Sequence, residues 1–120
     1  MWSGAFLLES IPPQVNDKIS KLQSTQAAYD TTVLQHQRVQ EELSEVEKAL
    51  ETLGQESGDE VYQFAGRVLV RRDKVKVETE LKEKQELLKL RDSALEKQEG
   101  KLKEKIQELE DSLKGSLKSQ

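Results

Sequence analysis

Large or apolar residues recur along residues 12–53 with mostly alternating steps of three and four. The stretch opens at Pro12-Pro13, which suits the first turn of a helix because proline lacks the backbone N–H. The repeat consists of Val15, Ile19, Leu22, Gln26, Tyr29, Val33, His36, Val39, Leu43, Val46, Leu50 and Leu53. This spacing predicts a long helix with one apolar stripe. Two three-residue steps meet at His36, which predicts a stammer there, and Gly54 is expected to cap the helix end.

A second repeat, along residues 74–117, is stricter. Leucines recur every seven residues at Leu81, Leu88, Leu95, Leu102 and Leu109. The other stripe position is polar at Gln85, Asp92 and Glu99 and becomes apolar at Ile106 and Leu113. Such a half-polar stripe favours packing on a partner helix, and Asp73 is placed to cap the helix start. Two helices of matched length predict an antiparallel coiled-coil hairpin that brings both chain ends together at one tip.

The connector, residues 54–73, carries β-branched and aromatic residues around the pair Gly66-Arg67. This pattern predicts a β-hairpin with a type II′ turn, in which Phe64 faces Leu69 and Ala65 faces Val68. Both faces of such a hairpin are apolar, and a lone two-stranded hairpin is marginal in water. We therefore expect hairpins of several copies, or of related chains, to close into a shared sheet or barrel. The oligomerisation residues are expected to be Val61, Tyr62, Phe64, Gly66, Val68, Leu69 and Val70.

The predicted fold class is mainly α, one domain over residues 1–120, with residues 1–11 as an apolar N-terminal arm. The chain has 34% hydrophobic and 35% charged residues and five aromatic residues, which favours an elongated architecture over a compact core. It has no cysteine, hence no disulfide or thiolate metal site, and one histidine excludes a histidine metal cluster. Residues 1–8 lack the basic flank of a signal peptide, and no apolar run approaches the roughly 18 residues of a membrane span, so the expected location is cytoplasmic.

The net charge of −4 is unevenly distributed. Residues 1–60 carry 4 basic and 11 acidic side chains, whereas residues 61–120 carry 15 basic and 12 acidic ones. This balance argues against nucleic acid as a partner, and the opposite signs suggest that the two halves lie against each other. No glycine-rich phosphate loop or Ser/His/Asp set is present, so we expect neither an enzyme nor a cofactor site.

The sequence resembles the prefoldin family, specifically its shorter β class. The resemblance spans about residues 11–113 and rests on Ile11-Pro12-Pro13-Gln14-Val15, on Val61-Tyr62 with Gly66-Arg67-Val68-Leu69-Val70, on Leu81-Lys82-Glu83-Lys84 and on Leu95-Glu96-Lys97-Gln98-Glu99. It implies a hexamer of two α-class and four β-class subunits, in which the hairpins assemble into an intersubunit β-barrel hub and the coiled coils hang from it. It also implies an ATP-independent holdase that captures unfolded client proteins at the coiled-coil tips and delivers them to a group II chaperonin.

By the same resemblance, the client-binding tip would consist of Trp2, Phe6, Leu7, Leu8, Ile11, Val15, Ile19, Ile106, Leu109, Leu113 and Leu117. For the stripe leucines the alternative is ordinary coiled-coil core, and for residues 1–10 it is a disordered terminus. A scaffolding coiled coil without client binding is the alternative function. A membrane-surface protein anchored by residues 1–8 would need nearby basic residues, and the first is Lys18. We therefore expect no membrane partner.

Overall fold

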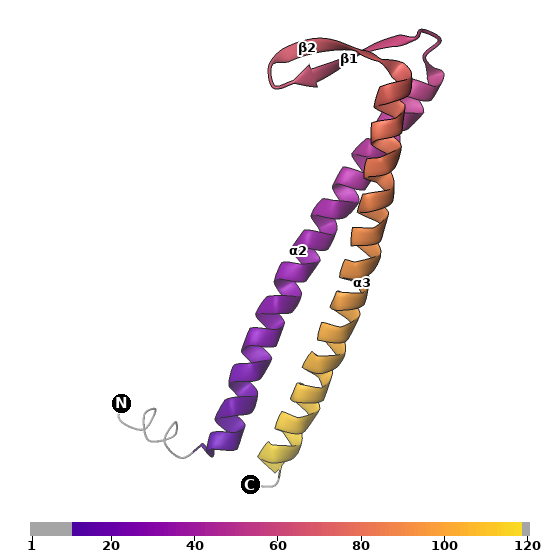
Figure 1. Ribbon diagram of the computed structural model, residues 1–120. Helices are drawn as coiled ribbons and strands as arrows, with labels where there is room; N and C mark the ends of the chain where they lie inside the picture. The colour runs from indigo at the N-terminus through magenta and orange to yellow at the C-terminus, as the bar shows by residue number, and fades with distance from the viewer. Residues whose placement is uncertain (1–10, 119–120) are drawn as a thin grey trace. The chain divides into compact units, whose positions relative to one another are not determined.

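A computed structural model of the chain describes residues 11–118 (Figure 1). Its elements in chain order are α2 (Pro13–Gln55), β1 (Glu60–Ala65), β2 (Val68–Asp73) and α3 (Lys74–Lys118). The predicted fold class, mainly α with one β-hairpin between two long helices, is confirmed. None of the described helices has an apolar stretch that could cross a membrane.

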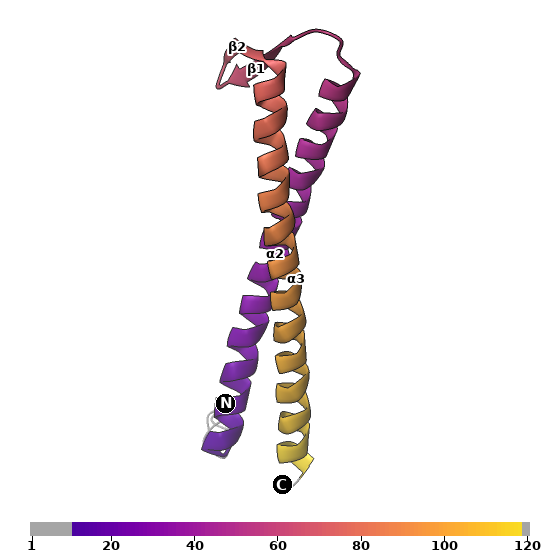
Figure 2. The ribbon, with the colours of Figure 1, turned by 45° about the vertical axis from the view of Figure 1, so that its right-hand side comes forward.

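The chain divides into two compact units, each containing part of both helices. The first unit combines the chain up to Leu34 with the chain from Glu96 onward, and the second comprises Gln35–Leu95. In the first unit, the start of α2 runs antiparallel to the end of α3 (Figures 1 and 2). Lys18 Nζ donates a hydrogen bond to Ser116 Oγ, and Gln98 Nε2 donates one to Thr32 Oγ1 at 3.2 Å.

In the second unit, the end of α2 packs on the start of α3 through a short apolar core. Val46 and Leu53 of α2 and Val77 and Leu88 of α3 are buried, and Leu88 is only 1% exposed. One polar pair interrupts this contact, because His36 Nε2 lies 2.7 Å from Asp92 Oδ1.

The contact stripe of α2 differs from the predicted one at two turns. Thr25 and Thr32 are buried, whereas Gln26 is exposed and Val33 is only half-buried. Each threonine hydroxyl donates to the carbonyl oxygen four residues earlier, at 2.7 Å for Thr25 and 2.8 Å for Thr32. The hydroxyls are thus satisfied within their own helix, which removes the cost of burying them. With Thr32 in the stripe, the three-four alternation passes through His36 without a break, so the predicted stammer is wrong.

The end of α2 also differs from the prediction. The helix continues through Gly54 to Gln55, and Gly66 is the only described residue with positive φ. Gly54 is therefore not a left-handed cap. The Glu56 N–H donates to the Leu53 carbonyl at 3.2 Å, which closes the last turn without a left-handed residue.

The β-hairpin has the predicted register. Phe64 pairs with Leu69 and Ala65 with Val68. Gly66 has φ of 66° and Arg67 has negative φ, which distinguishes the predicted type II′ turn from type I′.

Candidate functional site

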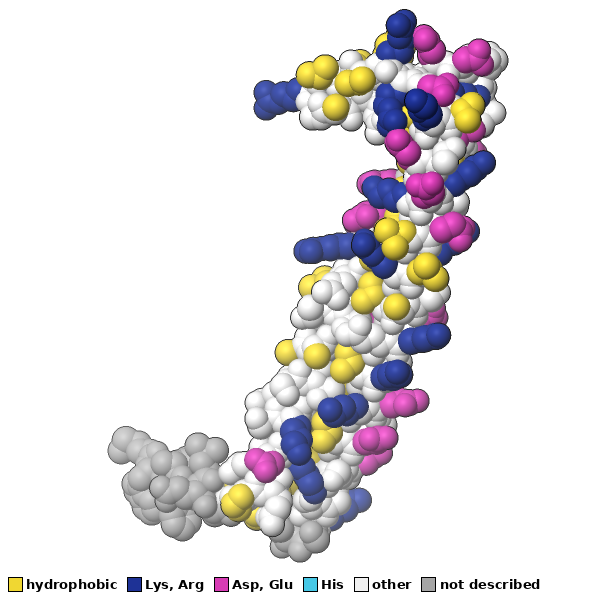
Figure 3. Space-filling model, viewed as in Figure 1, with side chains coloured by type: hydrophobic (Ala, Val, Ile, Leu, Met, Phe, Trp, Pro, Cys, Tyr) yellow, Lys and Arg dark blue, Asp and Glu magenta, His cyan; other side chains and the backbone are white. Residues whose placement is uncertain are grey.

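The apolar side chains of the hairpin form an exposed surface in the single chain. We call Tyr62, Phe64, Val68, Leu69 and Val70 the hairpin surface; all five are exposed, and Phe64 reaches 72%. Figure 3 shows hydrophobic side chains gathered on this part of the molecule. Such a patch of large apolar groups is typical of a protein–protein contact.

Both faces of the hairpin contribute to this surface. The strand register places Tyr62, Phe64 and Leu69 on one face and Val68 and Val70 on the other. An open groove of about 360 Å³ also lies beside β1, between it and the neighbouring helix ends. The helices therefore leave both faces available to another chain.

A charged contact fixes the hairpin to α3. Arg72 at the end of β2 donates two hydrogen bonds to Glu80, at 2.6 and 2.7 Å, and a third to Gln63 Oε1 of β1 at 2.9 Å. These hydrogen bonds, then the Arg72 charge and the charge of Lys76, hold the pKa of Glu80 below its ordinary value. The same carboxylate raises the pKa of Arg72, chiefly by hydrogen bonding. One arginine thus joins both strands to the helix that follows them.

Lys74 makes a second connection at the base of the hairpin. Its backbone N–H donates to the Asp59 carbonyl at 2.9 Å, and its Nζ donates to the Glu56 carbonyl. The start of α3 is therefore bonded to the loop that precedes β1. Sequence reasoning missed both this contact and the Arg72–Glu80 pair, because both depend on how β2 continues into α3.

The described tip candidates all belong to the first unit. Val15 is buried, and Leu117 is 55% exposed. Half-buried positions are occupied by Ile11, Ile19, Ile106, Leu109 and Leu113. The Lys18–Ser116 hydrogen bond shows that the two helix ends are adjacent. The remaining candidates, Trp2, Phe6, Leu7 and Leu8, lie outside the described residues.

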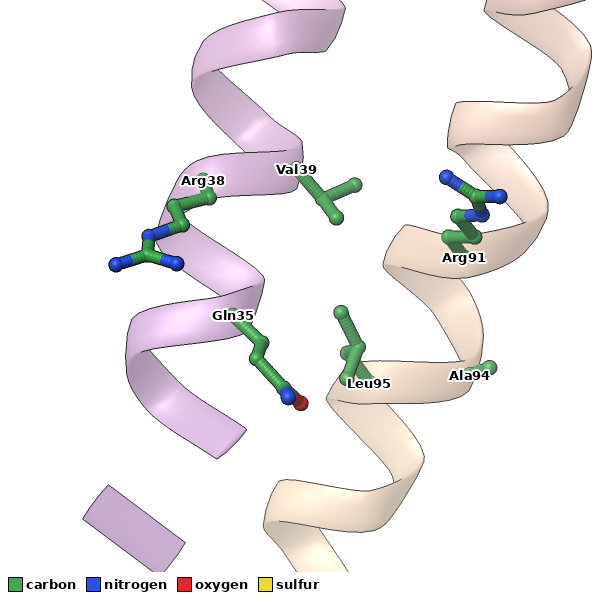
Figure 4. A pocket seen from close by; sticks show the side chains of 6 residues that line it. All are labelled: Gln35, Arg38, Val39, Arg91, Ala94 and Leu95. Carbon is green, nitrogen blue, oxygen red and sulfur yellow. The ribbon is translucent and has the colours of Figure 1, made fainter. Parts of the chain in front are cut away.

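A further hollow was not predicted and lies in the second unit. It measures about 430 Å³ and is lined by Gln35, Arg38, Val39, Arg91, Ala94 and Leu95. We call it the lateral groove (Figure 4). Within residues 11–118, no group of three or more His, Asp or Glu side chains is arranged to hold a metal ion.

Comparison with known proteins identifies the family. A family model described as "Prefoldin subunit" matches residues 16–120. The chain belongs to the prefoldin family. It is a subunit of a prefoldin chaperone and hence one component of a larger assembly.

Curated relatives of this family align with the chain over nearly their whole lengths. A protein of Thermococcus gammatolerans called "Prefoldin subunit beta" is 44% identical over 92% of this chain and 96% of its own. The protein of the same name from Thermococcus onnurineus is 41% identical over 92% of this chain and 97% of its own. A crystal structure of the prefoldin beta subunit from Thermococcus strain KS-1 matches with a TM-score of 0.79 and 42% identity, covering 90% of this chain and 96% of that one. The predicted resemblance to the β class of prefoldin is thereby confirmed.

Proposed function

We propose that the chain is a β-class subunit of a cytoplasmic hexamer containing two α-class and four β-class subunits. The hexamer acts as an ATP-independent holdase that captures unfolded proteins and delivers them to a group II chaperonin. Family membership and the order of helix, hairpin and helix support this proposal.

The exposure of the hairpin surface on both faces is the observation that carries the assembly proposal. Covering one large apolar side chain contributes about 1.5–3 kcal/mol, whereas association costs about 4–15 kcal/mol. A contact must therefore bury several such side chains at once to be stable. A β-barrel made of several hairpins does so, because each hairpin covers a face of its neighbour and its strand edges are paired.

The adjacent ends of α2 and α3 support client binding in the first unit. Leu117 presents an exposed apolar side chain there, and Ile11 and Ile19 are only partly covered. Each contact with an unfolded segment is weak, but several subunits holding one client add their contacts through avidity. The proposed role of the tip residues thus needs no shaped pocket.

Mass measurement by light scattering tests the assembly. The chain co-expressed with an α-class subunit should give the mass of a hexamer, which suppresses thermal aggregation of a model client without ATP. A particle no larger than a dimer, with no effect on aggregation, would instead support the scaffolding alternative.

A pair of equally exposed leucines tests the tip. Leu117→Ser, combined with removal of residues 1–10, should weaken aggregation suppression and leave the hexamer mass unchanged. Leu34→Ser is the matched control, because Leu34 is 57% exposed in the same unit but distant in sequence from both helix ends. Equal activity of the tip variant and the control would refute client binding at these residues.

A further inference from the structure

The lateral groove in the second unit is apolar within and basic at its sides. Val39 of α2 points toward α3, and Leu95 of α3 points toward α2, whereas Arg38 points away on the outer side of α2 (Figure 4). The hollow measures about 430 Å³ and is wide open to solvent, so it offers an apolar surface on which a segment of another chain can lie.

An exposed apolar strip of α3 extends the groove outward. Leu87, Leu90 and Ala94 follow one another at spacings of three and four, so they share one helix face with Arg91. Leu87 is exposed, and Leu90 is 70% exposed, the highest value among the large hydrophobic residues of the helices. Nothing in the second unit covers these leucines, because the contact between α2 and α3 uses Leu88 and Leu95 instead.

The charges of the groove select its occupant. Its lining includes two cations, Arg38 and Arg91, and no anion. Within the described residues, neither guanidinium takes part in a salt bridge or a side-chain hydrogen bond. A second copy docked symmetrically would place these arginines against their own equivalents, which is unfavourable. A segment with carboxylates beside its apolar side chains matches both features.

We propose that the lateral groove binds a polypeptide segment of the client in which apolar side chains are flanked by carboxylates. The inference rests on the proposed function, but it adds a binding site separate from the tip residues and sensitive to client charge. The apolar side chains of the segment lie on Val39, Ala94 and Leu95, and its carboxylates pair with Arg91 on α3 and, at the outer side of α2, with Arg38.

Two labelled peptides test the charge preference. Each is a 12-residue fluorescein peptide in which leucine alternates with glutamate or, in the second, with lysine, and each is titrated into the hexamer while anisotropy is measured. The glutamate peptide should bind about tenfold more tightly or better, a difference of about 1.4 kcal/mol. Its affinity should fall with salt, because charges near the surface are screened.

Variants then locate the site. Ala94→Gln and Arg91→Gln should each weaken binding of the glutamate peptide about three- to tenfold, because the first places a polar side chain in the groove and the second removes one charge pair. Val75→Gln and Lys97→Gln are the controls, since both residues are exposed on α3 outside the groove, and they should leave the affinity unchanged.

Three results would overturn the proposal. Equal affinity for the two peptides would remove the charge preference, and unchanged binding by both groove variants would place the peptide elsewhere. A loss of mass in Ala94→Gln without peptide would show that a subunit contact fills the groove. Aggregation suppression by the unmodified hexamer is measured in parallel. If the hexamer suppresses aggregation, a negative peptide result contradicts only the proposal for the groove. If it does not, the proposed function is contradicted as well.

Discussion

The helix pair and the hairpin surface differ in how far their apolar side chains are buried. On the helices, only about two positions in each seven are apolar, yet Val46, Leu53 and Leu88 are buried. In the hairpin, apolar residues are denser, yet Phe64 and Val68 are largely exposed. Burial here depends on whether a matching surface exists in the same chain, and hydrophobicity alone is a poor guide. The helices supply each other with that surface, whereas the hairpin finds none in its own chain.

The largest effect is expected from making the hairpin surface polar on both faces. Phe64→Ser combined with Val68→Ser should abolish the hexamer, because each face loses a large apolar contact. Light scattering measures the mass, and circular dichroism should show the helix content retained. Leu34→Ser should keep the full mass. A double variant that still forms hexamers would show that other surfaces hold the assembly together.

The effect of burial within the helix pair can be measured by substituting a core leucine and its exposed neighbour. Leu88→Ala should lower the free energy of unfolding by about 2–5 kcal/mol, because it leaves a cavity. Leu87→Ala, one residue away but exposed, should cost less than about 1 kcal/mol. Urea unfolding at fixed protein concentration measures both. Equal losses would mean that Leu87 is covered in the assembly and would contradict the burial contrast.

Alanine substitutions at two glycines compare the backbone constraints of the hairpin and of the helix pair. Gly66→Ala should cost about 1–2 kcal/mol because an L-residue at positive φ is strained. Gly100→Ala should stabilise by up to about 1 kcal/mol, since alanine favours a helix and an added Cβ would meet no atom within 4 Å. Thermal unfolding measures both shifts. A gain at Gly66 would contradict the left-handed turn geometry.

The smallest effect is expected from the exposed Arg72–Glu80 pair. The pKa of Glu80 is lowered in the folded chain, so its contribution is present above the unfolded pKa and is lost as pH falls through the folded value. Below about pH 4.5 the hairpin amides should therefore lose protection, measured as their exchange rate relative to that of an unfolded peptide at the same pH, and Glu80→Gln should weaken that pH dependence. Glu83→Gln, at an exposed carboxyl of the same helix, is the control. Identical profiles in the wild type and Glu80→Gln would rule out the pair as the cause.

Local patterns predicted the two helices, the hairpin register and its turn, because these depend on neighbouring residues. Thr25 and Thr32 were missed because a hydrophobic repeat omits polar side chains that satisfy their own hydrogen bonds. The Arg72–Glu80 contact depends on the junction of strand and helix, and the lateral groove depends on how two distant segments face each other. Neither leaves a periodic signal in the sequence. The tip residues remain a prediction.

The His36–Asp92 pair has a consequence for how the two helices can move. Sliding one helix by a heptad, about 10 Å, would carry the Asp92 carboxylate to the level of Leu43 or Tyr29. An acidic group facing such a side chain loses its hydrogen bond, so displaced alignments are disfavoured. The pair therefore fixes a single alignment of α2 on α3. Helices that part when a client is bound would close again in that same register, since every shifted register leaves the carboxylate unpaired.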